Sequence, residues 1–243
     1  MAIYLVTGAS SGIGEALARQ LCAAGHTVYG VARRGDKLAE LAGANSGRFF
    51  AFPGDVTDKD AVSRLCAALP QLPDVLILNA GVGEMDAKAG FDLALHERTF
   101  AVNYFGVMHF IDALLPRMQE RGAGKIAAVA SLAAYRGLPR AAAYGASKAA
   151  LSVAIESFRV TNIAHGVEFL TIHPGFVKTP MAGNSTDPRP FEWPVDKAAR
   201  FILASIEKGD ENISFPWSLR LGIGLLWLFP AGLYRRLVRK SQN

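Results

Sequence analysis

Short apolar runs alternate along this chain with segments of helical periodicity, and this alternation constrains the fold more than any other feature. The runs lack the polar residue at every second position that a half-exposed strand would show. Strands of this kind are buried on both faces, which is typical of a parallel sheet covered by right-handed crossover helices. The sequence therefore predicts one α/β domain built on a doubly wound parallel sheet. The predicted strands cover residues 3–6, 28–32, 49–52, 75–78, 126–130, 167–172 and 212–215.

Helical spacing appears between these runs. Ile13, Leu17 and Leu21 recur every four residues and would lie on one face of the first helix. Longer helices are predicted over residues 92–121, 141–164 and 195–208. Pro116 predicts a kink in the first of these three. Residues 180–194 hold four prolines and little periodicity, so they are predicted to form an irregular loop.

The residues that end the predicted strands are chemically distinctive. Ligands of an open parallel sheet bind beyond the carboxyl ends of its strands, at the point where the strand order reverses. Only the apolar runs were used to predict the strands, so the glycine, polar and charged residues at their ends are an independent observation. We therefore expect the ligand site at this edge of the sheet. The residues concerned are Gly8, Arg33, Asp55, Asn79, Ser131 and Pro174.

A glycine-rich turn follows the first strand. Glycine permits a tight turn and lets backbone N–H groups approach a diphosphate, which the positive end of a helix also attracts. The turn is therefore predicted to bind a dinucleotide cofactor, and the alternative is a plain turn that caps the helix. The residues expected to contact the cofactor are Gly8, Ser10, Ser11, Gly12, Ile13 and Gly14.

The same turn also matches G-x-S-x-G, the motif that holds the nucleophile of serine hydrolases. In those enzymes the motif follows a sheet that is already built, and a histidine acts as general base. Here the motif follows the first strand, and the candidate base His173 stands beside a Pro-Gly break without an obvious aspartate partner. The hydrolase interpretation is therefore disfavoured.

Two arginines, Arg33 and Arg34, follow the second strand. An acid at this place would hydrogen-bond the ribose diol of NADH, whereas arginine suits the 2′-phosphate of NADPH. Ala32 precedes the pair and Asp36 comes after it. We expect NADPH rather than NADH, with a solvated basic pair at the start of a helix as the alternative.

The net charge of +5 does not indicate nucleic-acid binding once the charges are located. Four cations lie in the last nine residues, so the rest of the chain carries only +1 and no basic stripe. These cations are Arg235, Arg236, Arg239 and Lys240.

The two cysteines, Cys22 and Cys66, lie far apart in helical segments, which predicts buried free thiols and a reduced, cytoplasmic setting. No cluster has metal-ligand spacing, so we expect no metal.

Several motifs, taken together in their order and spacing, resemble the short-chain dehydrogenase/reductase family in its short, non-extended form. They cover residues 1 to about 210 and are Thr7-Gly8-x-x-x-Gly12-x-Gly14, Asn79-Ala80-Gly81, Asn103, Ser131, Tyr144-x-x-x-Lys148 and Pro174-Gly175. The resemblance implies a Rossmann sheet of about seven strands, in agreement with the strands predicted above. It also implies an NADP(H)-binding catalytic domain over residues 1–210, which a C-terminal extension over residues 211–243 would follow.

Tyr144 and Lys148 lie four residues apart on a predicted helix and therefore share one face. Free tyrosine has a pKa of roughly 10, and a nearby ammonium would lower it towards the range useful for acid–base catalysis. The resemblance implies that Tyr144 gives its proton to a carbonyl oxygen as hydride arrives, while Lys148 binds the nicotinamide ribose. It also implies that Ser131 polarises the substrate oxygen and that Asn103 holds a water in a proton relay to Lys148.

The resemblance assigns further residues to the cofactor. Asp55 would contact the adenine together with the backbone N–H of Val56, although the alternative for Asp55 is a helix cap. The Asn79-Ala80-Gly81 motif would steady the central sheet and let the cofactor ribose approach. After the sixth strand, contacts with the nicotinamide amide are expected from Pro174, Gly175, Val177 and Thr179.

Substrate specificity is expected in the loops over residues 82–96, 132–140 and 180–194. Four residues predict an apolar pocket wall, and hence a lipophilic alcohol or ketone as substrate: Phe176, Met181, Phe191 and Trp193. The function predicted is hydride transfer between NADP(H) and a carbonyl or secondary alcohol. The alternative is a catalytically silent NADP(H)-binding sensor or scaffold protein. The family resemblance also implies a homodimer or homotetramer.

The C-terminal extension departs from the short family pattern. Its apolar run over residues 221–234 spans fourteen residues, fewer than the roughly 20 that a membrane-spanning helix needs. The first interpretation is a helix that covers the substrate entrance or packs on another subunit. The second is peripheral membrane contact through residues 219–240, because apolar aromatic residues stand beside the four C-terminal cations.

Overall fold

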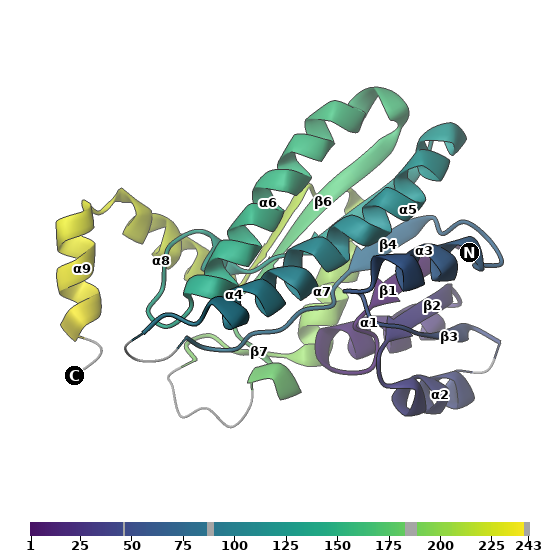
Figure 1. Ribbon diagram of the computed structural model, residues 1–243, viewed down its shortest axis with the longest axis horizontal. Helices are drawn as coiled ribbons and strands as arrows, with labels where there is room; N and C mark the ends of the chain where they lie inside the picture. Colours follow the sequence, from purple (N-terminus) through teal and green to yellow (C-terminus); the bar gives the residue numbers. More distant parts are fainter. Residues whose placement is uncertain (46, 87–89, 183–188, 241–243) are drawn as a thin grey trace.

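The computed structural model describes residues 1–45, 47–86, 90–182 and 189–240. Its central sheet has seven parallel strands in the order β3-β2-β1-β4-β5-β6-β9, which confirms the predicted doubly wound sheet (Figure 1). The order reverses between β1 and β4, so the switch point lies where these two strands end. The strands are β1 (Ile3–Thr7), β2 (Thr27–Ala32), β3 (Phe49–Pro53), β4 (Val75–Leu78), β5 (Gly124–Val129), β6 (Val167–Pro174) and β9 (Asn212–Phe215).

Helices cover both faces of the sheet. One face packs against α1, α2 and α7, whose buried side chains include Leu17, Leu38 and Ile202. The other face packs against α3, α5 and α6, through residues such as Leu114 and Ile155. The central strands are apolar on both sides because they lie between two helical layers, as the unbroken apolar runs predicted. The helices are α1 (Gly12–Ala23), α2 (Gly35–Ala44), α3 (Lys59–Ala67), α4 (Leu93–Phe100), α5 (Gly106–Arg121), α6 (Ala142–Asn162) and α7 (Val195–Lys208).

A π-helical turn, η1 (Ala101–Phe105), joins α4 and α5 into one long helical run. This run matches the helix predicted over residues 92–121, and Pro116 lies inside α5. The departure from α geometry lies upstream of Pro116, at the turn that holds Asn103. Such turns are rare in proteins and often occur at functional sites.

The described parts of the loop predicted over residues 180–194 contain some regular structure. A 3-10 turn, η4 (Pro180–Ala182), begins the loop, and β8 (Trp193–Pro194) ends it by pairing with β7 (Val177–Lys178). Residues 183–188 of the same predicted loop lie outside the described residues. Two further 3-10 turns follow longer elements: η2 (Leu132–Ala134) comes after β5, and η3 (Ile163–His165) comes after α6.

The C-terminal part of the chain first completes the sheet and then leaves it. β9 pairs with β6 at the sheet edge, so the sheet continues past residue 210 into the segment that we assigned to the extension. Two helices follow, α8 (Trp217–Leu228) and α9 (Ala231–Lys240), and both extend away from the sheet (Figure 1). Within the described part of the chain, no helix is long and apolar enough to cross a membrane.

Cys22 in α1 and Cys66 in α3 are buried free thiols, as the sequence predicted. Burial raises the pKa of Cys22 to about 11 and that of Cys66 to about 12. Both thiols therefore stay protonated at neutral pH and act as small apolar residues of the core.

Candidate active site

The glycine turn lies at the switch point, between β1 and α1. Gly8 and Gly12 have φ angles of 69° and 59°, in the left-handed region that favours glycine. A Cβ at Gly14 would lie 2.4 Å from the Gly8 carbonyl oxygen, and a Cβ at Gly8 would lie 2.9 Å from Asn79 Nδ2. The turn therefore requires glycine at these positions, and its backbone is open to close approach by a ligand.

A groove of about 360 Å³ runs from this turn across the ends of β2, β3 and β4, and its volume lies in the range of small-molecule sites. Most residues that the sequence assigned to a cofactor line it. They are Gly8, Ser10, Ser11, Gly12, Ile13, Arg33, Arg34, Asp55, Val56, Asn79, Ala80, Gly81 and Thr179. Five further lining residues were missed from the sequence, and each directly adjoins a predicted site residue in the chain: Ala32, Gly54, Val82, Val102 and Pro180. Met181, which was predicted for the substrate pocket, also lines the groove.

The two arginines differ in their contacts. The Arg34 guanidinium donates to the Ser10 hydroxyl at 2.9 Å and to the Ser10 carbonyl at 3.1 Å, so it holds the glycine turn. Arg33 lies exposed at the end of β2 and lines the same groove. Ser10, the nucleophile of the hydrolase alternative, is thus bound by Arg34, whereas His173 pairs with Ser152 at 3.1 Å. Ser10 and His173 therefore bind different partners, and the hydrolase interpretation would need them to pair with each other.

Asp55 follows β3 and closes a local turn. Its carboxylate accepts hydrogen bonds from the Thr57 backbone N–H at 2.9 Å and from the Thr57 hydroxyl at 2.8 Å. The N-cap of α3 is Asp58, which accepts from the Ala61 N–H at 2.9 Å, so the helix-cap alternative for Asp55 is wrong. Asp55 and the buried Val56 both line the groove. The expected contact with adenine requires both residues to lie there.

Asn79 joins β4 to β1. Its backbone N–H donates to the Thr7 hydroxyl at 2.9 Å, and its side-chain amide donates to the Thr7 carbonyl at 3.0 Å. The Ala80 N–H donates to the same hydroxyl at 3.0 Å. These bonds connect the two strands at the switch point, which is the sheet-steadying arrangement expected of the motif.

Tyr144 lies in the first turn of α6, and its phenol faces Ser131, which follows β5. The Ser131 hydroxyl also accepts from the Ala133 N–H at 3.1 Å, so turn η2 holds it in place. Burial raises the pKa of Tyr144, and the nearby Ser131 hydroxyl lowers it in part. The expected net lowering of the Tyr144 pKa is therefore wrong in direction, because burial outweighs the influence of Ser131.

Lys148 is almost fully buried, with 3% of its surface exposed. Its ammonium donates to the Val129 carbonyl at 2.6 Å, which connects α6 to the end of β5. Burial lowers the pKa of Lys148 to about 8, because the charged form loses its hydration. The lysine can therefore change its protonation near neutral pH, one helical turn away from Tyr144.

Asn103 is fully buried in the π-helical turn. Its side-chain oxygen accepts from the Val82 N–H at 2.8 Å, and its amide donates to the Val82 carbonyl at 3.0 Å. The same amide donates to the Ser147 hydroxyl at 3.0 Å, which links the segment after β4 to α6. A Cβ on Gly81 would lie 3.1 Å from Asn103 Oδ1 and 3.4 Å from Lys148 Nζ, so these groups converge. The water relay stays a prediction, whereas the bonds to Val82 and Ser147 are contacts that sequence reasoning missed.

The segment after β6 divides between the groove and the core. A Cβ on Gly12 would lie 3.3 Å from Thr179 Cγ2, so Thr179 faces the glycine turn. Val177 lies in the core and pairs with Trp193, away from the groove where its contact was expected. Trp193 stacks on Phe215 with ring centres 5.0 Å apart, so it belongs to the core rather than to the predicted pocket wall.

Met181 marks the substrate side of the site and is 56% exposed. A Cβ on Gly83 would lie 3.5 Å from the Met181 sulfur and 3.8 Å from Tyr144 Cε2. Met181 is therefore close to the phenol, as the predicted apolar wall requires. Phe176 and Phe191 are exposed on the neighbouring segments.

Pro174 and Gly175 connect the sheet to the C-terminal helices. Pro174 is the last residue of β6, and the Gly175 N–H donates to the Phe215 carbonyl at 2.7 Å. A Cβ on Gly175 would lie 2.7 Å from Leu219 Cδ2, so α8 packs closely against this glycine. Neither Pro174 nor Gly175 is among the residues that line the groove, so their contacts with the nicotinamide amide stay a prediction.

The C-terminal helices contact the segment over residues 132–140. The Tyr234 hydroxyl of α9 donates to the Gly137 carbonyl, and the Arg136 guanidinium lies 4.4 Å from the centre of the Tyr234 ring. Arg136 also donates to the Phe229 carbonyl at 3.3 Å. Because this segment leads from η2 to α6, the contact agrees with the interpretation that the extension covers the substrate side.

These features define a class of protein. A glycine turn at the switch point of a Rossmann sheet, with a buried lysine and a tyrosine beside a serine at the same edge, is the arrangement of a nicotinamide-dependent oxidoreductase.

Comparison with known proteins identifies the family. The family model for short chain dehydrogenases matches residues 2–190. An uncharacterized oxidoreductase from Myxococcus xanthus is 35% identical over 242 residues, which cover 97% of this chain and 96% of the relative. A fatty acyl-CoA reductase from Acinetobacter baylyi is 37% identical over 188 residues, which cover 74% of this chain and 63% of that relative.

The crystal structure of a short chain dehydrogenase from Burkholderia cenocepacia in complex with NADP matches with a TM-score of 0.85 at 28% identity, covering 98% of this chain and 97% of that one. The chain therefore belongs to the short-chain dehydrogenase/reductase family of oxidoreductases, as its motifs indicated.

Proposed function

We propose that this protein is an NADP(H)-dependent oxidoreductase that transfers hydride between the nicotinamide and a carbonyl or secondary alcohol. The observation that carries the proposal is the placement of the Tyr144 phenol beside Ser131, one helical turn from the buried Lys148. A sensor or scaffold protein would bind the cofactor without needing this set. The presence of all these groups therefore favours an active enzyme over the silent alternative.

The groove fits a dinucleotide cofactor. Its glycine turn lies at the start of α1, where backbone N–H groups attract a diphosphate, and Gly8 and Gly12 of this turn line the groove. At the end of β2, Arg33 and Arg34 supply the positive charge that a 2′-phosphate needs. The NADP bound to the Burkholderia cenocepacia relative also supports NADP(H). When bound, the cofactor would supply or accept the hydride.

The residues at the edge of the sheet suit proton transfer. During reduction, Tyr144 would donate its phenolic proton to the carbonyl oxygen, and its raised pKa keeps that proton in place at neutral pH. Ser131 would hold and polarise the same oxygen, because its hydroxyl already lies against the phenol. Lys148, with a pKa of about 8, would replace the lost proton from one helical turn away.

A lipophilic substrate is supported by the apolar side chains on the substrate side. Met181 lies close to Tyr144, and Phe176 and Phe191 are exposed nearby in the chain. One relative is a fatty acyl-CoA reductase. Each buried CH₂ group contributes about 0.8 kcal/mol to binding, so kcat/KM should rise with the chain length of an aldehyde or ketone.

Cofactor binding and turnover of the purified protein test this proposal. Fluorescence titration should give tighter binding for NADPH than for NADH, and NADPH should be oxidised faster with decanal or 2-decanone than with acetaldehyde or acetone. Binding without turnover of any carbonyl would favour the sensor or scaffold alternative. Failure to bind either cofactor would refute the proposed function as a whole.

We also propose that the C-terminal helices contact the surface of an anionic membrane. α8 exposes Trp217, Leu221 and Leu225, and α9 exposes Leu233. In the sequence, five cations and no acidic residue follow Glu211. Apolar side chains beside uncompensated positive charge suit the interface of a bilayer that contains anionic lipids.

Sedimentation of the full chain with lipid vesicles tests the membrane contact. Vesicles of phosphatidylcholine with phosphatidylglycerol should bind the protein more than pure phosphatidylcholine does, and salt should weaken that binding. Arg235→Glu/Arg236→Glu should bind less. The control Arg64→Glu/Arg200→Glu makes the same charge change on α3 and α7 and should bind like the wild type. A concentration-dependent dimer that Leu225→Asp abolishes would instead show that a second copy covers this face.

The homo-oligomer implied by the family resemblance is also part of the proposal. Phe105 in η1 and Val153 and Val160 in α6 are exposed apolar residues on the helices that hold Asn103 and Tyr144. An interface through these helices would remove them from water. Light scattering should therefore give a dimer or tetramer, which Val153→Asp/Val160→Asp should shift towards monomer.

A further inference from the structure

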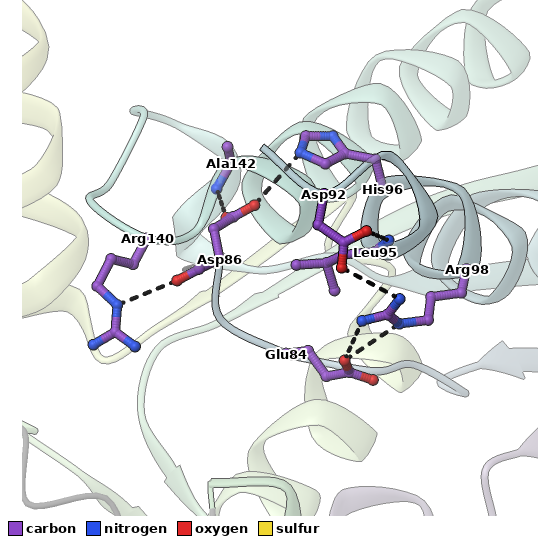
Figure 2. Close-up of polar contacts among 8 residues, drawn as sticks. All are labelled: Glu84, Asp86, Asp92, Leu95, His96, Arg98, Arg140 and Ala142. Atoms are coloured by element: carbon purple, nitrogen blue, oxygen red, sulfur yellow. Dashed lines mark hydrogen bonds and ion pairs between the residues drawn. The ribbon is translucent and has the colours of Figure 1, made fainter. Parts of the chain in front are cut away.

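Helix α6, which holds Tyr144 and Lys148, begins without a cap of its own. Ala141 occupies its N-cap position, and an alanine side chain cannot accept a hydrogen bond from the first turn. The first turn of any helix leaves backbone N–H groups without partners inside the helix. Here the Asp86 carboxylate accepts from the Ala142 N–H at 2.5 Å, so a residue from a distant segment supplies the missing cap (Figure 2).

Further contacts hold Asp86 in place. Its other carboxylate oxygen lies 3.4 Å from His96 Nε2 on α4. Its backbone N–H donates to the Arg140 carbonyl at 2.9 Å, and the Arg140 side chain donates back to the Asp86 carbonyl at 3.3 Å. Arg140 has a φ of 57°, which is uncommon for a residue with a side chain, and the Asp86 side chain is only 14% exposed. Asp86 is therefore tied to α4 and to the start of α6 together.

The chain that leads to Asp86 runs along the site. Before it, Val82 is bound through both its N–H and its carbonyl by Asn103. A Cβ on the next residue, Gly83, would lie 3.8 Å from Tyr144 Cε2. The Asp86 cap then meets α6 two residues before Tyr144. A shift of the first turn of α6 would therefore move the phenol directly.

We propose that Asp86 is a positioning residue that holds the first turn of α6 and thereby the Tyr144 phenol against Ser131. This inference rests on the proposed proton transfer by Tyr144. The Asp86 carboxylate accepts a hydrogen bond from a backbone N–H group and lies at the positive end of α6. Hydrogen bonding and the helix dipole therefore both favour a carboxylate at this position. Displacement of a reacting group by about 1 Å can cost on the order of a hundredfold in rate. Because other residues line the cofactor groove, removal of Asp86 should lower kcat rather than weaken cofactor binding.

Asp58 is a matched control at the start of α3. Its carboxylate caps that helix by accepting from the Ala61 N–H at 2.9 Å. Loss of this cap removes the same kind of interaction from a helix that does not hold Tyr144. Comparison of the two variants therefore separates positioning of the phenol from a general loss of stability.

Steady-state kinetics with NADPH and decanal test the proposal. Asp86→Ala should lower kcat on the order of ten- to a hundredfold and leave the KM for NADPH within about twofold. Asp86→Asn retains an oxygen that can accept from the Ala142 N–H and should recover most of the lost kcat. Asp58→Ala should keep kcat within about threefold of the wild type. Equal losses of kcat in the two alanine variants would overturn the proposal.

Hydrogen–deuterium exchange gives a second readout that does not require activity. In Asp86→Ala, amides over residues 142–146 should exchange roughly two- to thirtyfold faster, the range expected when a helix cap is lost. The same amides in Asp58→Ala should exchange as in the wild type. If the wild type reduces no carbonyl but exchange responds as expected, the proposed function fails while the Asp86 contact stands. Unchanged exchange in Asp86→Ala would overturn the role of Asp86 whatever the activity.

Discussion

The cofactor side and the substrate side of this molecule are built in different ways. On the cofactor side the backbone itself shapes the groove, because Gly8 and Gly14 are packed so closely that a side chain would collide with neighbouring atoms. On the substrate side a side chain from a distant segment holds the structure, as Asp86 does for the first turn of α6. The comparison teaches that one half of the site depends on close packing of the backbone, whereas the other depends on a side-chain contact between distant segments.

This difference has a consequence for function. The residues that line the groove should determine cofactor affinity, and the residues around the phenol should determine turnover. Tyr144 and Lys148 lie outside the groove lining, although both belong to the same edge of the sheet. Substitutions on the two sides should therefore affect different kinetic and binding constants, and a variant that changes both alike would break the separation.

Tyr144→Phe should have the largest effect. Removal of the phenolic hydroxyl takes away the proposed proton donor beside Ser131, so kcat should fall on the order of a hundred- to ten-thousandfold. The Kd for NADPH should stay within about twofold, because other residues line the groove. Kinetics with decanal and fluorescence titration with NADPH measure the two quantities.

Tyr135→Phe is the control for this substitution. Tyr135 follows turn η2, and its ring lies 5.0 Å from that of His173, centre to centre. Loss of its hydroxyl should leave kcat within about twofold of the wild type. Near-normal turnover in Tyr144→Phe would remove the proton-transfer role, and an equal loss of NADPH binding would show that the two sides are not separate.

Lys148→Met should change how stability depends on pH, because burial sets the properties of this group. The folded protein holds Lys148 at a pKa of about 8, whereas the unfolded chain keeps the ordinary value of 10.5. Between these values the unfolded state binds more protons, so the wild-type free energy of unfolding should rise with pH in this window, by up to about 3 kcal/mol. The methionine variant lacks the titrating group and should not show this rise in urea unfolding experiments.

Lys59→Met gives the matched comparison, since this exposed lysine makes a surface ion pair with Asp112 at 3.1 Å. Its pH dependence should follow that of the wild type, because a surface ion pair contributes only about 0–1 kcal/mol. Parallel stability curves for the wild type and Lys148→Met would contradict the lowered pKa of the buried lysine.

The sheet and the glycine turn could be predicted because their physical requirements leave traces in short stretches of sequence. A strand buried on both faces must be apolar along its whole length. A turn with left-handed backbone at Gly8 and Gly12 favours glycine there. The Tyr144 to Lys148 spacing could be recognised for the same reason, because four residues are one helical turn.

The contacts between distant segments could not be predicted. Asp86 stands in the sequence as an ordinary loop acid, and its partner Ala142 lies 56 residues further on. The direction of the Tyr144 pKa was missed for a related reason. The sequence shows a lysine one turn away, but it does not show the burial that raises the pKa of the phenol.

The two arginines should give the smallest effects and the sharpest test of the cofactor side. Arg33→Ala removes charge from the groove and should weaken NADPH binding on the order of tenfold, while NADH binding stays within about twofold. Arg34→Ala removes the hydrogen bonds to Ser10 and should weaken both cofactors alike, by about three- to tenfold. Fluorescence titration of each variant with both cofactors measures these constants.

Arg64→Ala, on α3, should bind both cofactors as the wild type does and controls for the loss of a positive charge. If Arg33→Ala weakened NADPH and NADH equally, the 2′-phosphate would not be its ligand and the preference for NADPH would lose its basis. If only Arg34→Ala discriminated between the cofactors, Arg34 would have to leave Ser10 in order to reach the phosphate. The cofactor side would then depend on side-chain contacts that form on binding, and it would resemble the substrate side more closely than its glycine backbone indicates.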